Sequence, residues 1–200
     1  MSGEFVPPDY FRRLDPGDLP GGGAPLEVDL GCGDGAFLLG MANEFPERRF
    51  LGVERLLGRV RKVCRKITRG GPGNARVLRL ESRYAVEWLL PHASVSRLHL
   101  LCPDPWPKLK HHRRRILQPE FLRAVHDVLV PGGEFLFMTD HGEYHEWAGE
   151  KFDAFPEFDR LPWCDGDFYY PKTDFQLLWE SEGKSMHRTR CRKPVTDSPV

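Results

Sequence analysis

The chain has 200 residues, of which 40% are hydrophobic and 29% charged, and its 29 basic residues are balanced by 29 acidic ones. These values are typical of one globular domain of ordinary size, and no stretch has the roughly 18 to 20 apolar residues of a membrane-spanning helix. The five cysteines are scattered without a Cys-x-x-Cys pair, which argues against a disulfide framework or a zinc cluster. The amino terminus also lacks the pattern of a secretory leader, so we expect a cytoplasmic protein.

Short apolar runs alternate along the chain with segments of helical periodicity. Runs typical of strands lie at 26–30, 49–53, 75–80, 95–101 and 134–139. Helical spacing is found at 36–45, 55–69 and 84–90, from Pro119 to Leu129, and at 144–155. Alternating strands and helices predict a doubly wound α/β fold, with a mostly parallel seven-stranded sheet and helices on both faces.

The beginning of the chain and its last third are less regular. Residues 1–25, with five prolines and five glycines, are expected to form a flexible lead-in or a loosely packed arm. Two antiparallel strands are expected within 158–191, the last of them near either Phe175–Trp179 or Ser185–Cys191. The predicted domain therefore covers residues 26–192 and is followed by a tail at 193–200.

Acidic residues mark the ends of the five predicted parallel strands: Asp29, Glu54, Glu81, Asp104 and Asp140. Ligands of doubly wound sheets bind beyond the carboxyl ends of the strands, at the point where the strand order reverses. We therefore expect these five side chains to surround a binding site.

Residues 29–35 read Asp-Leu-Gly-Cys-Gly-Asp-Gly and connect the first of these strands to the first helix. Gly31 and Gly33 permit the turn and let a ligand approach the backbone closely. A dinucleotide fingerprint has a different glycine spacing, and the carboxylates of Asp29 and Asp34 would repel a pyrophosphate. They favour a cationic ligand without phosphate, such as S-adenosylmethionine.

Two further acids complete the predicted cofactor site. Glu54 ends the second strand, where it can accept hydrogen bonds from two ribose hydroxyls. Glu81 ends the third strand and is a candidate for the adenine edge, although Ser82 or Tyr84 can serve there instead.

The segment Cys102–Arg115 follows the fourth strand and reads Cys-Pro-Asp-Pro-Trp-Pro-Lys-Leu-Lys-His-His-Arg-Arg-Arg. Three prolines at alternate positions fix backbone φ angles and remove N–H donors, so the segment is predicted to be a stiff loop. The loop holds Asp104 and Trp106 at the carboxyl end of the strand, and Trp106 suits loop packing as well as stacking on a base. His111 and His112 lack a second cluster of metal ligands, so they are interpreted as surface residues and no metal site is expected.

Basic residues gather in three blocks that contain no acid: seven lie between Arg55 and Arg69, five between Lys108 and Arg115, and five between Lys184 and Lys193. Such segregation of charge in a neutral protein indicates either one anion-binding face or three unrelated solvated surfaces. The first alternative is the footprint of a nucleic-acid partner.

Several motifs lie at or near the predicted strand ends: Asp29 to Gly35, Gly52-Val-Glu54, Pro103-Asp-Pro-Trp-Pro-Lys108 with His111 and Arg113 to Arg115, Thr139-Asp140, and Thr173-Asp-Phe-Gln176. Together they resemble the bacterial tRNA (guanine-N7)-methyltransferases, from Leu26 to about Arg192. The resemblance implies a Rossmann-like class I methyltransferase fold. It also implies methyl transfer from S-adenosylmethionine to N7 of guanosine 46 in the variable loop of tRNA.

The resemblance assigns roles to individual residues. The cofactor would be bound by Asp29, Gly31, Gly33, Glu54, Glu81 and Asp104, with Asp104 as the catalytic carboxylate next to the methyl group and the target base. The substrate would be bound by Lys108, Asp140, Thr173, Asp174, Phe175 and Gln176, and tRNA phosphates by Lys110, Arg113, Arg114 and Arg115. The family usually has glutamate at the position of Gln176. Because an amide accepts hydrogen bonds at one atom only, this departure would weaken selectivity for guanine unless Asp140 or Asp104 covers the role.

The chemistry implied by this family requires few protein groups. N7 of guanine has a lone pair and no proton, so no general base is needed, and a carboxylate such as Asp104 stabilises the positive charge that develops on the ring. Two other functions stay open: a small-molecule methyltransferase of the same fold, and a tRNA-binding relative without catalytic activity. We expect tRNA as the partner, no membrane association, and a monomer or homodimer.

Overall fold

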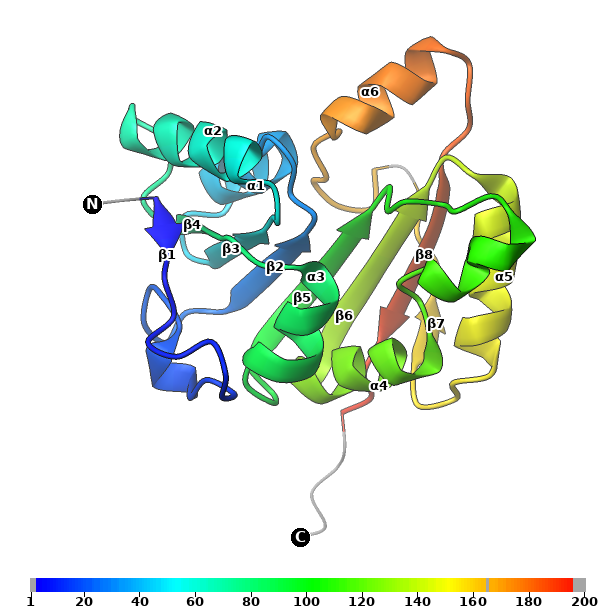
Figure 1. Cartoon of the computed structure of the whole chain (residues 1–200), viewed down its shortest axis with the longest axis horizontal. Coiled ribbons are helices and arrows are strands. Elements are labelled where there is room, and N and C mark those ends of the chain that lie inside the picture. The colour runs from blue at the N-terminus through cyan, green and yellow to red at the C-terminus, as the bar shows by residue number, and fades with distance from the viewer. Residues whose placement is uncertain (1–2, 165, 196–200) are drawn as a thin grey trace, which may run out of the picture.

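One eight-stranded sheet forms the centre of the computed structural model, which describes residues 3–164 and 166–195 (Figure 1). In spatial order the strands are β1 (Glu4–Phe5), β4 (Ala75–Leu78), β3 (Arg49–Val53), β2 (Leu26–Leu30), β5 (Val95–Leu101), β6 (Leu129–Thr139), β8 (His187–Arg192) and β7 (Asp159–Leu161). All pairings are parallel except those of β8, which runs antiparallel to both of its neighbours. The strand order reverses between β2 and β5, where doubly wound sheets bind their ligands.

Helices cover both faces of this sheet. One face carries α1 (Ala36–Glu44) and α2 (Leu57–Thr68), whose apolar side chains cluster with β3 and β4. The other face carries α3 (Ser82–Tyr84), the π-helical turn η2 (Ala85–Leu89), α4 (Pro119–Val128) and α5 (Gly142–Asp153). The short helix α6 (Asp174–Ser181) lies beyond the carboxyl ends of β5 and β6 (Figure 1). No helix within the described residues is both long and apolar enough to cross a membrane.

The predicted fold class is confirmed, with three differences in detail. The sheet has eight strands rather than seven because the short β1 adds to the edge beside β4. β6 begins at Leu129 rather than Glu134, since the turn before it pairs with β5 through an irregular register. Of the two positions considered for the last strand, the later one is correct, and Phe175–Trp179 is wrong because this stretch lies inside helix α6.

The amino-terminal segment packs more closely than the expectation of a flexible lead-in or loose arm. β1 pairs with β4, and the backbone N–H of Leu14 donates to the carbonyl of Leu89 at 2.8 Å. Leu14 and Leu19 are buried in the core cluster beneath η2 and α4. These apolar residues are spaced irregularly among prolines and glycines, so no periodicity reveals their burial in the sequence.

The side chains of the central strands alternate between the two faces of the sheet. Leu26, Val28 and Leu30 of β2 enter the core shared with α4 and α5. The intervening Glu27 and Asp29 therefore point to the face covered by α1. His99 of β5 lies on that same face, because it hydrogen-bonds to Glu27. This face carries the site described next.

Candidate functional site

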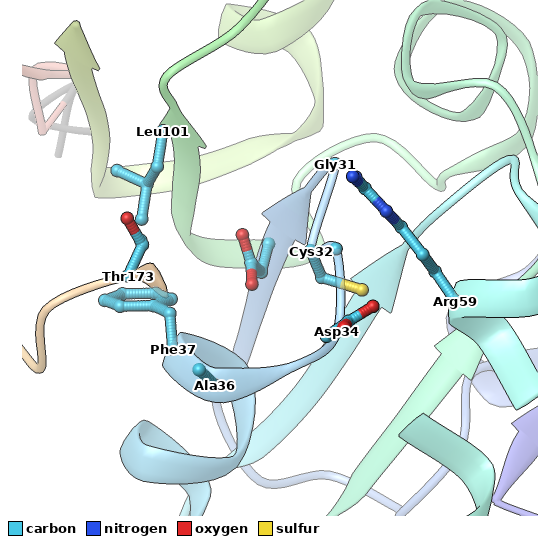
Figure 2. Close-up of a pocket in the computed structure, with 10 residues that line it drawn as sticks. Gly31, Cys32, Asp34, Ala36, Phe37, Arg59, Leu101 and Thr173 are labelled. Atoms are coloured by element: carbon cyan, nitrogen blue, oxygen red, sulfur yellow. The ribbon is translucent and has the colours of Figure 1, made fainter. Parts of the chain in front are cut away.

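A pocket opens between the carboxyl ends of β2 and β5 and the amino-terminal end of α1 (Figure 2). It contains about 560 Å³ of empty space when its open mouth is included. Arg59 reaches in from α2 on one side, and Phe37, Leu101 and Thr173 border the other. The full lining consists of Asp29, Gly31, Cys32, Gly33, Asp34, Ala36, Phe37, Arg59, Leu101 and Thr173.

The glycine loop requires its glycines for conformational reasons. Gly31, Gly33 and Gly35 have φ angles of 73°, 57° and 81°, in the left-handed region that other residues rarely adopt. At Gly35 a side chain is also excluded by space, because a Cβ atom would lie 2.9 Å from a methyl group of Val63. The backbone N–H of Gly31 donates to the carbonyl of Val53 at 2.8 Å, which holds the loop against the end of β3.

Asp29 places an unpaired carboxylate oxygen in this pocket. The side chain is 4% exposed, and its Oδ2 atom is buried without a hydrogen-bond partner. Burial and, to a smaller extent, the nearby negative charge of Glu54 together raise the pKa of Asp29 to about 7. A cation bound here would satisfy the orphaned oxygen and favour the ionised carboxylate. The pocket therefore fits the cationic S-adenosylmethionine that the sequence predicts.

Glu54 lies directly behind the pocket rather than in its lining. Its carboxylate accepts a hydrogen bond from the backbone N–H of Leu56 at 2.8 Å, and its other oxygen is 3.7 Å from the guanidinium of Arg59. Since Arg59 itself lines the pocket, its side chain would lie between Glu54 and a bound ligand. Its predicted contact with the ribose hydroxyls stays a prediction that requires Arg59 to move aside.

Two lysines of α2 hold the glycine loop from outside. Lys62 donates to a carboxylate oxygen of Asp34 at 2.9 Å, and Lys66 donates to its backbone carbonyl at 2.7 Å. The hydrogen bond from Lys62 lowers the pKa of Asp34. Part of the first basic block therefore stabilises the cofactor loop, although both lysines are also exposed to solvent.

Glu81 caps the amino-terminal end of helix α3. Its two carboxylate oxygens accept from the backbone N–H groups of Arg83 and Tyr84, at 3.0 and 2.8 Å, and so cap helix α3. Glu81 does not line the pocket. The predicted contact with adenine is not supported by this geometry and stays a prediction.

The proline loop is held in an unusual backbone conformation at the carboxyl end of β5. Cys102 and Trp106 have positive φ angles of 49° and 43°, which are sparsely populated for residues with side chains. The N–H of Cys102 donates to the carbonyl of Met138 at 2.8 Å, which continues the pairing with β6. Asp104 lies between these two residues, is exposed, and makes no hydrogen bond or ion pair with any described residue. Its carboxylate is therefore available to a ligand.

Trp106 is half-buried in this loop. The Arg114 guanidinium lies over its ring at 4.9 Å, and His111 contacts the ring edge at 5.8 Å between centroids. These contacts come from the 3₁₀ helix η3 (Leu109–Arg114), which holds the basic segment. The Arg114 guanidinium covers one face of the indole ring, so a base could not stack on that face while Arg114 stays in place.

The prediction that Arg115 binds a phosphate is wrong. Arg115 is 1% exposed and forms a bidentate ion pair with Glu143. Its Nε atom donates to the carbonyl of Pro105 at 2.9 Å, and its guanidinium lies between the rings of Tyr144 and Trp147. This buried cation anchors the proline loop to α5. Four other basic residues of the segment are exposed, namely Lys108, Lys110, Arg113 and Arg114.

The segment Thr173–Gln176 forms the first turn of α6. The Thr173 hydroxyl caps the helix by accepting from the backbone N–H of Gln176 at 2.9 Å. The Gln176 side chain is 4% exposed and donates through Nε2 to Glu180 at 2.8 Å, and Glu180 is paired with Lys172. The side chains of two other predicted substrate residues, Asp174 and Phe175, lie outside the described part of the structure.

Asp140 is paired with the third basic block. Its carboxylate is 3.6 Å from the ammonium group of Lys184, which also lies over the Trp179 ring of α6. Other members of this block are bound within the fold, since Arg190 pairs with Glu134 and Lys193 donates to two backbone carbonyls. Several cations of the third block are therefore held by groups of the fold itself.

Comparison with known proteins identifies the family. A family model described as "Putative methyltransferase" matches residues 23–189. The tRNA (guanine-N(7)-)-methyltransferase of Halorhodospira halophila is 38% identical over 180 residues, which cover 87% of this chain and 77% of that protein. The chain belongs to the tRNA (guanine-N(7)-)-methyltransferase family. The tRNA (guanine-N(7)-)-methyltransferase of Syntrophotalea carbinolica is 30% identical over 194 residues, 92% of this chain and 84% of that protein. As a member of this family the protein is a methyltransferase that depends on S-adenosylmethionine.

Solved structures support the fold assignment. The crystal structure of the 16S rRNA methyltransferase KamB has a TM-score of 0.62 to this chain at 22% identity, and the alignment covers 85% of this chain and 88% of that one. At this level of identity the likeness shows the shared fold alone. The Rossmann-like methyltransferase fold is thereby confirmed.

Several residues that the structure places at this methyltransferase site were not predicted from the sequence. Phe37 and Arg59 line the pocket, and Glu180 orients Gln176. Arg59 belongs to the first basic block, for which the sequence indicated either an anion-binding face or a solvated surface. The spacing of Gln176 and Glu180, one helical turn apart, is a signal that could have revealed their hydrogen bond had the helix been recognised.

Proposed function

We propose that this protein transfers the methyl group of S-adenosylmethionine to N7 of guanosine 46 in the variable loop of tRNA. The observation that carries the proposal is the position of the proline loop. It leaves β5 directly after Leu101, which lines the cofactor pocket, so the free carboxylate of Asp104 is tethered beside that pocket. The family relationship supports tRNA guanosine as the acceptor.

The cofactor side of the reaction depends on the glycine loop. When bound, S-adenosylmethionine supplies an electrophilic methyl group on a positively charged sulfur. The ionised carboxylate of Asp29 binds the ligand's positive charge in a site where it has no other partner. The φ-positive glycines let the ligand lie against the backbone.

The substrate side requires orientation and charge stabilisation rather than proton removal. N7 of guanine attacks with its own lone pair, and the ring becomes cationic as the bond forms. Asp104 stabilises this charge electrostatically, and the strained proline loop keeps its carboxylate at a fixed position. Thr173 borders the pocket on the same side as Leu101, and Gln176 follows it in the first turn of α6.

The tRNA backbone is held by exposed cations. The proline loop and η3 present Lys108, Lys110, Arg113 and Arg114, and the outer side of α2 presents Arg61, Arg65 and Arg69. Such contacts supply affinity that falls with salt and carry no base specificity. Selectivity for guanine is left to Asp140, Gln176 and Asp104.

The cell compartment follows from thiol chemistry. All five cysteines are free, which agrees with a reducing compartment, so we place the activity in the cytoplasm. The expectation of a monomer or homodimer stays a prediction.

The test is transfer of a tritiated methyl group to unmodified tRNA transcripts that carry guanosine or adenosine at position 46. We expect incorporation with guanosine only. Asp104→Asn should lower turnover by about a hundredfold or more, because one electrostatic contact to the developing charge is lost, while far-UV circular dichroism stays unchanged. Incorporation that does not depend on the base at position 46, or no incorporation at all, would refute the proposal.

A further inference from the structure

A buried row of polar side chains lies on the same sheet face as Asp29. His99 of β5 contacts Glu27 of β2 through Nε2 at 2.9 Å and the hydroxyl of Tyr170 through Nδ1 at 2.9 Å. Glu27 and His99 are each 1% exposed. Burying polar groups is costly unless each is hydrogen-bonded, so the row is stable only when all three members are in place.

The donor and the acceptor of each hydrogen bond in this row can be assigned. Burial raises the pKa of Glu27, but the hydrogen bond from His99 and the neighbouring arginines outweigh it and lower that pKa to about 2. Burial lowers the pKa of His99, which keeps the imidazole neutral at pH 7. An ionised carboxylate can only accept, so Nε2 of His99 carries the proton. Nδ1 must then accept, and the hydroxyl of Tyr170 donates to it.

Tyr170 belongs to a group of three aromatic side chains, Trp163, Phe168 and Tyr170, that we call the aromatic strap. Their ring centroids lie 4.9 to 5.9 Å apart. The strap rests on charged groups of the sheet, because Phe168 lies 5.1 Å from the guanidinium of Arg97 and 5.0 Å from that of Arg190. The strap is therefore held by contacts with these cations as well as by packing of Trp163 and Tyr170 against the apolar core.

The strap is connected to the cofactor pocket in two ways. Thr173, which lines the pocket and caps α6, follows Tyr170 closely in the chain. Phe37, which also lines the pocket, contacts the rings of both His99 and Tyr170, at 4.9 and 4.6 Å between centroids. Pro171 lies against Gly40 of α1, where a Cβ atom would be only 3.0 Å from its ring. The position of the strap thus determines the positions of Thr173 and Phe37, which form two walls of the pocket.

We propose that Tyr170 and His99 are positioning residues for the cofactor pocket. Their hydrogen bond fixes the aromatic strap in the position that brings Thr173 and Phe37 against the bound ligand. This inference rests on the proposed function only for the identity of that ligand. The hydrogen bond joins residues 71 positions apart and ties the least regular part of the chain to the centre of the sheet.

The test compares Tyr170→Phe with Tyr169→Phe, which removes the same atom from the preceding residue. Tyr169 is 44% exposed, and its hydroxyl makes no hydrogen bond with a described residue. Loss of the Tyr170 hydroxyl leaves Nδ1 of His99 buried and unpaired, which should weaken binding of S-adenosylhomocysteine about tenfold in calorimetry. Amide hydrogen exchange should accelerate in residues 166–173 and stay unchanged in β2 and β5. Tyr169→Phe should match the wild-type protein in both measurements.

A second variant keeps the inference testable if Tyr170→Phe folds poorly. Phe168→Leu removes the ring that lies over Arg97 and Arg190 and leaves every hydrogen-bonding group of the buried row in place. It should loosen the strap and weaken ligand binding in the same way. Unchanged affinity and exchange in Tyr170→Phe, or equal effects of the two tyrosine variants, would overturn the inference. A wild-type protein that fails to bind S-adenosylhomocysteine would refute the proposed function instead.

Discussion

Replacing Asp29 by asparagine should stabilise the protein in the absence of cofactor and weaken its binding of S-adenosylmethionine. The carboxylate is buried with one oxygen unpaired, so ionising it in the folded protein is unfavourable. Asparagine keeps the shape of the side chain and removes its charge. Removal of the charge also removes the group that binds the ligand's positive charge.

The magnitude follows from the pKa of about 7 in the folded protein and about 3.9 in the unfolded chain. Because the folded state holds its proton more tightly, stability falls as pH rises from about 4 to 7, by about 4 kcal/mol as an upper bound. Between pH 5 and pH 8 the fall is about 2 to 3 kcal/mol. The Asp29→Asn variant lacks this contribution, so its stability relative to wild type should increase by that amount over the same interval.

Urea unfolding of both proteins at pH 5 and pH 8, without cofactor, measures this difference. Glu44→Gln is a matched control, because it removes an exposed carboxylate from the neighbouring helix α1. Calorimetric titration with S-adenosylmethionine should show weaker binding to Asp29→Asn at pH 8. A stability difference that is the same at both pH values would show that Asp29 is not a strained carboxylate, and would remove the reason for assigning it to the cofactor.

Three further substitutions test the roles assigned above. Arg115→Met should cost about 2 to 3 kcal/mol in urea unfolding, because it removes the charged hydrogen bonds of a buried guanidinium to Pro105 and to the exposed Glu143. Arg114→Met should leave stability within about 0.5 kcal/mol and weaken tRNA filter binding; the reverse pattern would contradict the assignment. Gln176→Glu should raise the rate of methyl transfer only when it is combined with Glu180→Gln, because the single change places two carboxylates next to each other. Equal rates in the single and double variants would exclude this coupling. Gly35→Ala should destabilise by about 2 kcal/mol, measured by urea unfolding, because its φ of 81° is strained for alanine; an unchanged midpoint would show that the loop adapts.

The parts of the site that the sequence predicted are those encoded by neighbouring residues. The glycine loop contains its turn, its helix start and its acid within seven positions, so Asp29, Gly31 and Gly33 could be assigned without a structure. Helix α6 was missed although Thr173 and Gln176 have the spacing of a capping box, because aromatic and β-prone residues around them also suit a strand.

The parts that could not be predicted depend on contacts between distant residues. The hydrogen bond from Tyr170 to His99 spans 71 positions, and that from His99 to Glu27 spans 72. Arg115 has the same local sequence character as Arg114, and only the position of Glu143 on α5 decides that one is buried and the other exposed. A run of basic residues shows where cations lie along the chain, but not which of them are buried in ion pairs within the fold.

Helix α2 has a consequence for how the two substrates affect each other. Its inner lysines, Lys62 and Lys66, hold the cofactor loop, while Arg61 and Arg65 on its outer side are available to tRNA phosphates. A displacement of this helix by tRNA would therefore change the affinity for the methyl donor. Thermodynamic linkage requires the donor to change tRNA affinity by the same factor. A movement of this one helix would thus couple the binding of the two substrates.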